Sequence, residues 1–402
     1  MTTKNNIPAG YKDSAVGIIP QEWCVFDFGD IAYVSKEKYT PTKSSHIACV
    51  ELEHLSQGDG VLLGYTEAGL QKSTKNIFKK GSILFGKLRP YLRKYWLATF
   101  EGVCSSEIWV LNTNEEVCIK EYLYRLISSE RFIQFANVSI GSKMPRADWD
   151  FVSLTPFSVP PIEEQRKIAE ILGVWDEAIE KQSRLIEKLE LRKRGLMQHL
   201  LTGRTRLPGF IDEVLYKKLK PFIVEKSERN TNQTYTNVLS VTNNRGFINQ
   251  AEQFDREVAS DNTANYKLVH RGQFAYNPSR VNVGSLDLLQ TYDLGILSPM
   301  YIVFETRQTM DPKFLFYQLK SGWFVGHIPM YVQGSVRDSL SFDGLENMRF
   351  WIPSLPEQKA IAEVLTTADN EIATHRKKLD ALRLQKRGLM QQLLTGKTRV
   401  KI

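Results

Sequence analysis

One segment of this chain occurs twice, at residues 160–206 and again at residues 353–399. The second copy follows the first at a constant offset of 193 residues, as in the pairs Gln165 with Gln358 and Gly203 with Gly396. A fixed period within one chain indicates duplicated structural units. Two copies are too few for a solenoid, so the repeat predicts twofold pseudo-symmetry. It also suggests a binding target that is itself bipartite.

The repeated segment has the pattern of a long helix with a coiled-coil seam. Its apolar positions alternate in steps of four and three, which is the spacing that makes two helices supercoil. In the first copy they are Ile168, Leu172, Trp175, Ile179, Ile186, Leu189, Leu196 and Leu200, and in the second Ile361, Leu365, Ala368, Ile372, Leu379, Leu382, Leu389 and Leu393. Polar residues fill the remaining seam positions, namely Gln182 and Lys193, then His375 and Lys386.

The ends of both helices are marked in the sequence. Pro160-Pro161 and Pro356 precede the first turns, where proline is tolerated, and Gly203 and Gly396 follow as C-terminal stops. Each helix is therefore expected to have roughly 38 residues, or about 57 Å at 1.5 Å per residue. Because an apolar stripe needs a partner, the simplest arrangement is an antiparallel pair within the chain. The alternative is that each helix packs separately on its own domain.

The repeat extends into the two globular segments, although they have diverged. GVCSSEIWVL from Gly102 aligns with GILSPMYIVF from Gly295, and KKGSILFGKLRPY from Lys79 resembles HRGQFAYNPSRVN from His270. Short apolar runs at 82–85, 108–111 and 300–304 predict strands, and 119–129 and 312–321 predict short helices. The expected fold class is α+β: two mixed α/β globular domains at 1–159 and 207–352, separated by two long antiparallel coiled-coil helices at 160–206 and 353–402, with internal pseudo-twofold symmetry.

Composition narrows the class of protein. The 402 residues suffice for two or three domains, and 42% hydrophobic with 24% charged residues is typical of a soluble globular protein. There is no run of eighteen apolar residues, and the start has no apolar signal core, so neither a membrane span nor export is expected. Four cysteines without CxxC spacing fit a reducing cytoplasm. A net charge of +8 and a pI of about 9.1 favour a polyanionic partner.

Most candidate nucleic-acid contacts cluster in one stretch of each globular segment, and the others follow the paired turns Gly141-Ser142 and Gly334-Ser335. Basic residues interleaved with aromatic ones run from Lys72 to Trp96, and the matching stretch of the second half carries polar amides. Cations neutralise phosphates, Arg can read guanine, and amides suit adenine. The candidates are Lys87, Arg89, Tyr91, Arg93, Lys94, Lys143 and Arg146 in the first half, and Tyr276, Asn277, Ser279, Arg280, Asn282 and Arg337 in the second. The alternative is that these are solvated surface residues.

No catalytic or metal site is predicted. Asn277-Pro278-Ser279-Arg280 lacks the second proline and the aromatic residue of an adenine-gripping tetrad, and Gly396-Lys397-Thr398 lacks the upstream glycine of a P-loop. The six histidines show no metal-ligand spacing. A single-chain nuclease or methyltransferase would need the cofactor loop or metal cluster that this sequence does not offer.

The chain resembles the DNA-specificity subunit of type I restriction-modification systems over essentially its full length. The residues that carry the resemblance are Pro160-Pro161, Glu164-Gln165 and Ile168-Ala169, then Pro356-Glu357-Gln358 and Ile361-Ala362, the KRGLMQ and LLTG helix ends, and Ile19-Pro20 with Trp23. One departure is that the second unit starts with Leu207-Pro208-Gly209-Phe210, without the Ile-Pro…Trp opening.

The resemblance implies two target-recognition domains, each reading one half of a bipartite double-stranded DNA site, with the helices as the spacer. It also implies partners, namely two methyltransferase (modification) subunits and the restriction (motor-nuclease) subunits, and no membrane. The chain itself is then non-catalytic and without cofactor, and S-adenosylmethionine, ATP and Mg are expected on the partner subunits. The remaining alternative is a protein-binding coiled-coil scaffold without DNA readout.

The helix ends are nearly identical in the two copies, whereas the globular parts differ. A partner surface shared by both helices would produce this contrast, and so would sequence drift in the loops of the globular parts. The candidate partner contacts are Glu164, Gln165, Lys193, Arg194 and Leu196 in the first copy, and Glu357, Gln358, Lys386, Arg387 and Leu389 in the second.

Overall fold

The computed structural model describes residues 7–138, 144–250, 262–332 and 339–401. The chain divides into two compact units. Unit 1 comprises Met1–Ser183 together with Lys378–Ile402, and unit 2 comprises Arg184–Lys377. Each unit therefore takes about half of each long helix, and the division falls inside the helices and not at their ends.

The globular part of unit 1 contains a four-stranded and a five-stranded sheet, and short helices pack against the four-stranded one. Its strands are β1 (Tyr11–Lys12), β2 (Ile19–Pro20), β3 (Cys24–Asp27), β4 (Ala32–Val34), β5 (Lys38–Tyr39), β6 (Ala48–Val50), β7 (Thr66–Glu67), β8 (Lys75–Phe78), β9 (Ile83–Gly86), β10 (Tyr95–Leu97), β11 (Gly102–Cys104), β12 (Ile108–Thr113) and β13 (Pro156–Val159). Its helices are α1 (Phe28–Ile31), α2 (Lys120–Ile127), α3 (Glu130–Ala136) and α4 (Trp149–Ser153), with 3-10 turns η1 (Leu52–His54), η2 (Ala68–Leu70) and η3 (Pro90–Leu92).

The globular part of unit 2 has a closely related set of elements. Its strands are β14 (Leu215–Lys218), β15 (Ile223–Lys226), β16 (Leu239–Thr242), β17 (Gly246–Asn249), β18 (Lys267–His270), β19 (Phe274–Tyr276), β20 (Leu286–Leu288), β21 (Leu294–Leu297), β22 (Ile302–Thr306) and β23 (Arg349–Ile352). Its helices are α6 (Pro312–Leu319), α7 (Gly322–His327) and α8 (Phe342–Asn347), with 3-10 turns η5 (Val281–Val283) and η6 (Ile328–Met330).

The two units share the topology of their central sheet. In unit 1 the order is β10-β9-β12-β4, and in unit 2 the equivalent strands follow as β20-β19-β22-β15. A separate strand pair, β13 with β3 in unit 1 and β23 with β14 in unit 2, leads into each long helix. The expected duplication of the globular segments is therefore confirmed, as is the mixed α/β character of each.

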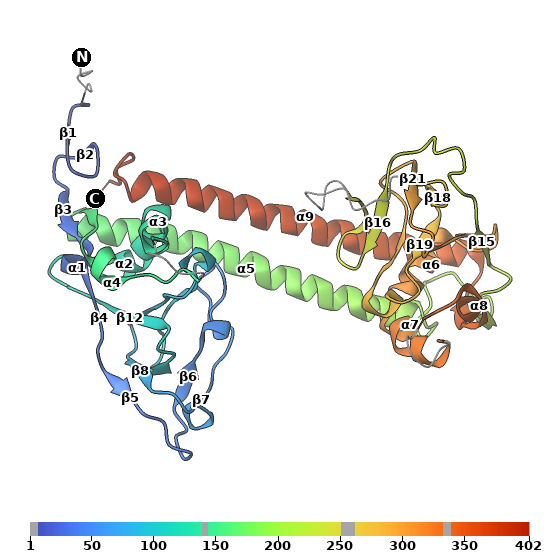
Figure 1. Ribbon diagram of the computed structural model, residues 1–402, viewed down its shortest axis with the longest axis horizontal. Helices are drawn as coiled ribbons and strands as arrows, with labels where there is room; N and C mark the ends of the chain where they lie inside the picture. Colours follow the sequence, from blue (N-terminus) through green and yellow to red (C-terminus); the bar gives the residue numbers. More distant parts are fainter. Residues whose placement is uncertain (1–6, 139–143, 251–261, 333–338, 402) are drawn as a thin grey trace. The chain divides into compact units, whose positions relative to one another are not determined.

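The repeated segments form two uninterrupted helices, α5 (Ile162–Leu200) and α9 (Leu355–Leu393), as Figure 1 shows. Each has 39 residues, close to the expected length. Gly203 and Gly396 follow the helix ends, both with φ of 70°, a conformation that glycine adopts without strain. One boundary differs from the expectation, because α9 begins at Leu355 and Pro356 already lies in its first turn.

The two helices run antiparallel within each unit. In unit 1, Glu164 contacts Arg399 just beyond α9, and farther along α5 Asp176 contacts Lys386. As the residue number rises along α5, the number of the contacting residue falls along α9 and the residues just beyond it, so the two helices are antiparallel. The core of unit 1 holds Ile168 and Leu172 from α5 together with Leu393, the last residue of α9. Because each core contains the start of one helix and the end of the other, the alternative of separately packed helices is wrong.

Candidate nucleic-acid interface

A hairpin loop between β9 and β10, residues 87–94 (loop A), contains the basic cluster expected in unit 1. The 3-10 turn η3 lies at its centre, and Arg89 and Arg93 on either side of the turn adopt left-handed conformations with φ of 53° and 50°. Such conformations are uncommon for residues other than glycine and tend to occur where a loop serves a function. Arg89 and Tyr91 are exposed, and Lys87 is half-buried.

Loop A is attached to the segment that carries the other candidate cations of unit 1. The backbone N–H of Arg89 donates to the carbonyl of Pro145 at 2.8 Å, and the N–H of Ala147 donates to the carbonyl of Lys87 at 2.8 Å. These bonds place Arg146 beside loop A, so two stretches far apart in the sequence meet. Lys143 lies outside the described residues.

The cations around loop A differ in their availability. The Arg93 guanidinium contacts the Glu130 carboxylate, and this hydrogen bond holds the pKa of Glu130 below its ordinary value. Lys94 donates to the carbonyl of Leu52 at 2.5 Å.

Arg146 donates to both carboxylate oxygens of Glu107, at 3.1 and 3.2 Å. Lys87 and Arg89, in contrast, form no ion pair with any described residue. Among the described residues of loop A, these two basic side chains therefore lack an ionic partner within the chain.

The equivalent loop of unit 2, residues 277–285 (loop B), joins β19 to β20. Ser279, Arg280 and Asn282 are exposed on it. The N–H of Leu340 donates to the carbonyl of Pro278 at 3.1 Å, just as Ala147 bonds to loop A. The Asn277 side-chain oxygen accepts from the Ser279 N–H at 3.1 Å, which leaves a lone pair for a further donor. Arg337 lies outside the described residues.

Tyr276 is a correction to the expected contacts. Its side chain is fully buried against Phe304, with ring centroids 6.1 Å apart, and burial raises the pKa of its phenol far above the ordinary value. A side chain in this position packs the core and cannot reach a base. The alternation Phe274-Ala275-Tyr276 contained the signal, because every second residue of a strand faces the same side.

Two glutamines expected at a partner surface are instead buried inside their own units. The Gln165 amide accepts from Ile119 N–H at 2.9 Å and donates to the carbonyls of Val117 and Pro160 at 2.8 and 2.9 Å. The same pattern recurs in unit 2, where Gln358 accepts from Asp311 N–H at 2.8 Å. Both amides join the start of a long helix to the start of a short one. They have no surface to offer a partner.

Glu164 and Glu357 are also buried and paired within the chain. Glu164 accepts from the Trp23 indole N–H at 2.9 Å and from Arg399 at 2.8 and 3.0 Å. Glu357 accepts from Arg206 at 2.7 and 2.6 Å. These pairs attach the chain that follows one helix to the first turn of the other. The expectation of partner contact gives way to a structural role, because neither carboxylate is exposed.

The other candidate partner contacts divide into two groups. Lys193 and Lys386 are paired with Asp369 and Asp176, and the half-buried Leu196 and Leu389 pack against the cores. Arg194 and Arg387 are exposed, and the latter lies 4.0 Å from Glu130.

Two exposed leucines on the helices were not predicted from the sequence. Leu191 and Leu384 occupy equivalent positions, 62% and 68% exposed. The sequence does distinguish these two leucines, because both lie outside the heptad seam and still recur at the 193-residue offset. Together with Arg194 and Arg387, they form a small surface on each helix that has both apolar and basic character.

Several of the charged side chains around a cavity in unit 1 are paired with one another. The cavity, of about 780 Å³, is bordered by α3, α9 and the first hairpin. Its carboxylates Asp59 and Asp176 bind Arg383 and Lys386. Among the described residues there is no group of three or more His, Cys, Asp or Glu side chains that could hold a metal ion. Nor is any described helix long and apolar enough to cross a membrane.

The family comparison covers most of the chain. A family model described as "Type I restriction modification DNA specificity domain" matches residues 20–191 and again residues 210–384. The two matches correspond to the two copies of the globular-plus-helix repeat.

Individual relatives are distant in sequence. The type I restriction enzyme EcoDI specificity subunit of Escherichia coli is 27% identical over 203 residues, and the aligned part spans 49% of this chain and 44% of that protein. The putative MjaX specificity subunit of Methanocaldococcus jannaschii is 25% identical over 425 residues, 97% of each chain.

Two solved structures share the fold. One describes the complex assembly and conformational transition of a type I R-M system, with a TM-score of 0.59, 18% identity and coverage of 94% of this chain and 99% of that one. The other is the S subunit of the type I restriction-modification system of M. genitalium, with a TM-score of 0.54, 15% identity and coverage of 98% and 99%. At these identities the likeness concerns the fold alone.

Proposed function

The chain belongs to the family of type I restriction-modification DNA specificity domains, and on this premise we propose that it is the sequence-reading subunit of such a complex. Its globular domains each recognise one half of a bipartite DNA target, and the helix pair sets the distance between the halves. The chemistry is carried out by partner subunits, so the chain is not catalytic alone.

One observation carries this proposal. Loops A and B occupy equivalent places on equivalent sheets, yet they present different side chains. Loop A offers Arg89, suited to phosphate or to the guanine edge, whereas loop B offers Arg280 and amides such as Asn282, and amides suit adenine. Matched positions with unlike side chains are what two different half-sites would require.

The helices support the spacing role. A helix of 39 residues is about 58 Å long, which exceeds the 34–36 Å of one turn of duplex DNA. Two domains carried by such helices could read sites separated by a fixed number of base pairs that neither domain contacts.

The partners follow from the same premise. We propose that methyltransferase subunits dock on the helix surface that includes Leu191 and Arg194, and on its equivalent at Leu384 and Arg387. Exposed leucines beside arginines suit an apolar partner surface with acidic residues at its edge. S-adenosylmethionine, ATP and Mg would then be bound by the methyltransferase and motor-nuclease subunits.

The decisive experiment is to sequence methylated adenines in DNA from cells that carry this chain with its methyltransferase. A bipartite motif with a fixed gap is expected. The second candidate function, a protein-binding scaffold, is favoured only by the exposed leucines, and it predicts neither a motif nor salt-sensitive DNA binding by the complex.

Replacing both Lys87 and Arg89 by alanine is expected to weaken DNA binding for all sequences and to reduce its salt dependence. Removal of one cation from a phosphate lowers the slope of log K against log salt by about 0.9, so the slope of the double variant should fall by about 1.8 if both residues bind phosphate. Binding of the complex to a duplex at several salt concentrations measures this slope.

The matched control is the double variant Lys79→Ala with Lys80→Ala, which removes the same charge from the turn at the opposite end of β9. Its slope should remain that of the parent chain. An equal reduction in both double variants would mean that net charge, and not loop A, determines the effect.

A further inference from the structure

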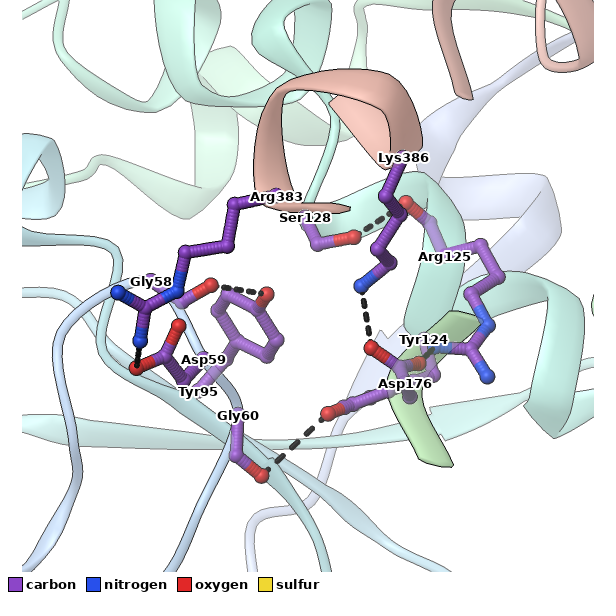
Figure 2. Close-up of polar contacts among 10 residues, drawn as sticks. All are labelled: Gly58, Asp59, Gly60, Tyr95, Tyr124, Arg125, Ser128, Asp176, Arg383 and Lys386. Atoms are coloured by element: carbon purple, nitrogen blue, oxygen red, sulfur yellow. Dashed lines mark hydrogen bonds and ion pairs between the residues drawn. The ribbon is translucent and has the colours of Figure 1, made fainter. Parts of the chain in front are cut away.

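Asp176, near the middle of α5, binds two cations from two different elements. Its carboxylate contacts Lys386 of α9 and Arg125 of the short helix α2, as Figure 2 shows. Arg125 is only 9% exposed. One carboxylate therefore connects both long helices and the globular domain of unit 1. These three residues are called the Asp176 cluster.

Unit 2 contains an equivalent cluster, centred on Asp369 of α9. The carboxylate accepts from Lys193 of α5 at 2.5 Å and from the phenol of Tyr317 on the short helix α6 at 2.8 Å. Tyr317 is 4% exposed, and its phenol oxygen also lies 3.3 Å from the hydroxyl oxygen of Thr366. Asp369 and Lys193 lie at the 193-residue offset from Asp176 and Lys386, so both clusters have the same plan. Only the third member differs, an arginine in unit 1 and a tyrosine in unit 2.

The two clusters specify the register of the helix pair, which an apolar seam alone does not. A heptad seam of leucines and isoleucines tolerates a shift of register, whereas a polar residue within it specifies one register. Hydrogen bonds to a charged group are directional and stronger than neutral ones. The lysine in each cluster fixes one helix against the other. The third member, Arg125 or Tyr317, fixes the globular domain against the helix pair.

In unit 1, hydrogen bonds also connect α9 to loop A. Asp59 receives a hydrogen bond from Arg383 of α9 at 3.0 Å (Figure 2). The neighbouring Gly58 N–H donates to the carbonyl of Arg93 in loop A at 2.9 Å, and Gly58 accepts from Tyr95 at 3.0 Å. Gly60 completes the turn with φ of 67°, and an added Cβ would lie 1.9 Å from the Tyr124 oxygen, so a larger residue there would displace Tyr124.

We propose that Arg125 and Tyr317 are positioning residues that determine the number of base pairs between the two half-sites. The inference rests on the proposed function. It adds that the gap depends on how each globular domain is held on the helices as well as on helix length. Neither residue touches DNA on this view, and neither alters which bases are read.

The test compares the methylated motifs made by the full complex with Tyr317→Phe, with Arg125→Met and with both substitutions. Each single variant removes bonds to one aspartate, the double variant removes bonds to both, and every variant leaves the aspartate–lysine pairs intact. The half-site sequences should be unchanged, while modification at sites whose gap is one base pair longer or shorter should rise about tenfold, the scale of one hydrogen bond to a charged group. Sequencing of methylated adenines measures both quantities together.

The control for Tyr317→Phe is Tyr301→Phe in the same unit, which removes a phenol that accepts from Val241 N–H at 3.4 Å inside the globular domain. Its gap should stay that of the parent chain. Arg125→Lys, which keeps the cation, should restore the parental gap relative to Arg125→Met.

An unchanged gap in Tyr317→Phe and in the double variant would overturn the inference. If Arg125→Met fails to fold, the gap measured for the more conservative Tyr317→Phe variant still tests the inference. A parent complex that yields no bipartite motif would instead contradict the proposed function, so the two failures are distinguishable.

Discussion

Replacing Glu164 by alanine is expected to lower the free energy of unfolding by about 3 kcal/mol, toward the lower end for breaking a buried ion pair. The carboxylate is fully buried and satisfies both the Trp23 indole and the Arg399 guanidinium. Its removal leaves a buried N–H without an acceptor, while water can partly solvate the arginine, whose side chain is 32% exposed. Chemical denaturation followed by tryptophan fluorescence measures the change.

The adjacent Glu163 provides the control. It is 71% exposed and pairs with Arg166 at 3.8 Å, so Glu163→Ala should change stability by less than about 0.5 kcal/mol. Equal effects of the two substitutions would contradict the structural role of Glu164. A loss of partner binding without a loss of stability in Glu164→Ala would restore it as a partner contact.

Exchanging residues 207–352 for the equivalent segment of another specificity subunit is expected to replace one half of the methylated motif completely. The exchanged segment contains loop B and its supporting sheet, and it leaves α5, α9 and loop A unchanged. The other half-site and the adenine modified in it should therefore stay the same. Sequencing of methylated adenines before and after the exchange gives the result.

The reciprocal exchange of the first globular segment should change the opposite half only. A chimera that altered both halves would show that the two domains do not read independently. A chimera with new bases but an altered gap would instead point to the Asp369 cluster, because the exchange replaces Tyr317.

The helices could be predicted from the sequence because their determinants are local. A heptad pattern repeated twice fixes the seam, and Gly203 and Gly396 end it with the expected left-handed conformation. The loops could be located too, since basic and aromatic residues between two apolar runs mark an exposed hairpin. The helices and loops can therefore be predicted without knowing which residues pack against them.

Side-chain roles in the site were less predictable, because they depend on distant neighbours. Glu164 and Gln165 resemble surface residues in sequence, since charged and amide side chains are mostly exposed. Their burial follows from Arg399 and Ile119, which the sequence does not bring near. Tyr276 differs from these two residues, because its burial has a local determinant: it shares a strand face with the buried Phe274.

The missing Ile-Pro…Trp opening of the second unit also has a physical explanation. In unit 1, Gly396 lies against Pro20 and Trp23, whereas in unit 2 the equivalent Gly203 lies against Val214. Valine fills the site but has no side-chain N–H to donate. Glu357 can do without that donor, because two nitrogens of Arg206 reach it at 2.7 and 2.6 Å.

The division of the chain into units has a consequence for its synthesis. The core of unit 1 includes Met390, Leu393 and Leu394, near the end of the chain, although most of unit 1 emerges first from the ribosome. At about 5–20 residues per second, the stretch from Ser183 to Lys378 takes about 10–40 s to translate. Unit 2 is contiguous in sequence and can form its core during that interval. The domain that is made first is thus the last to be completed, and a chain that stops short of α9's final turns lacks part of its N-terminal core.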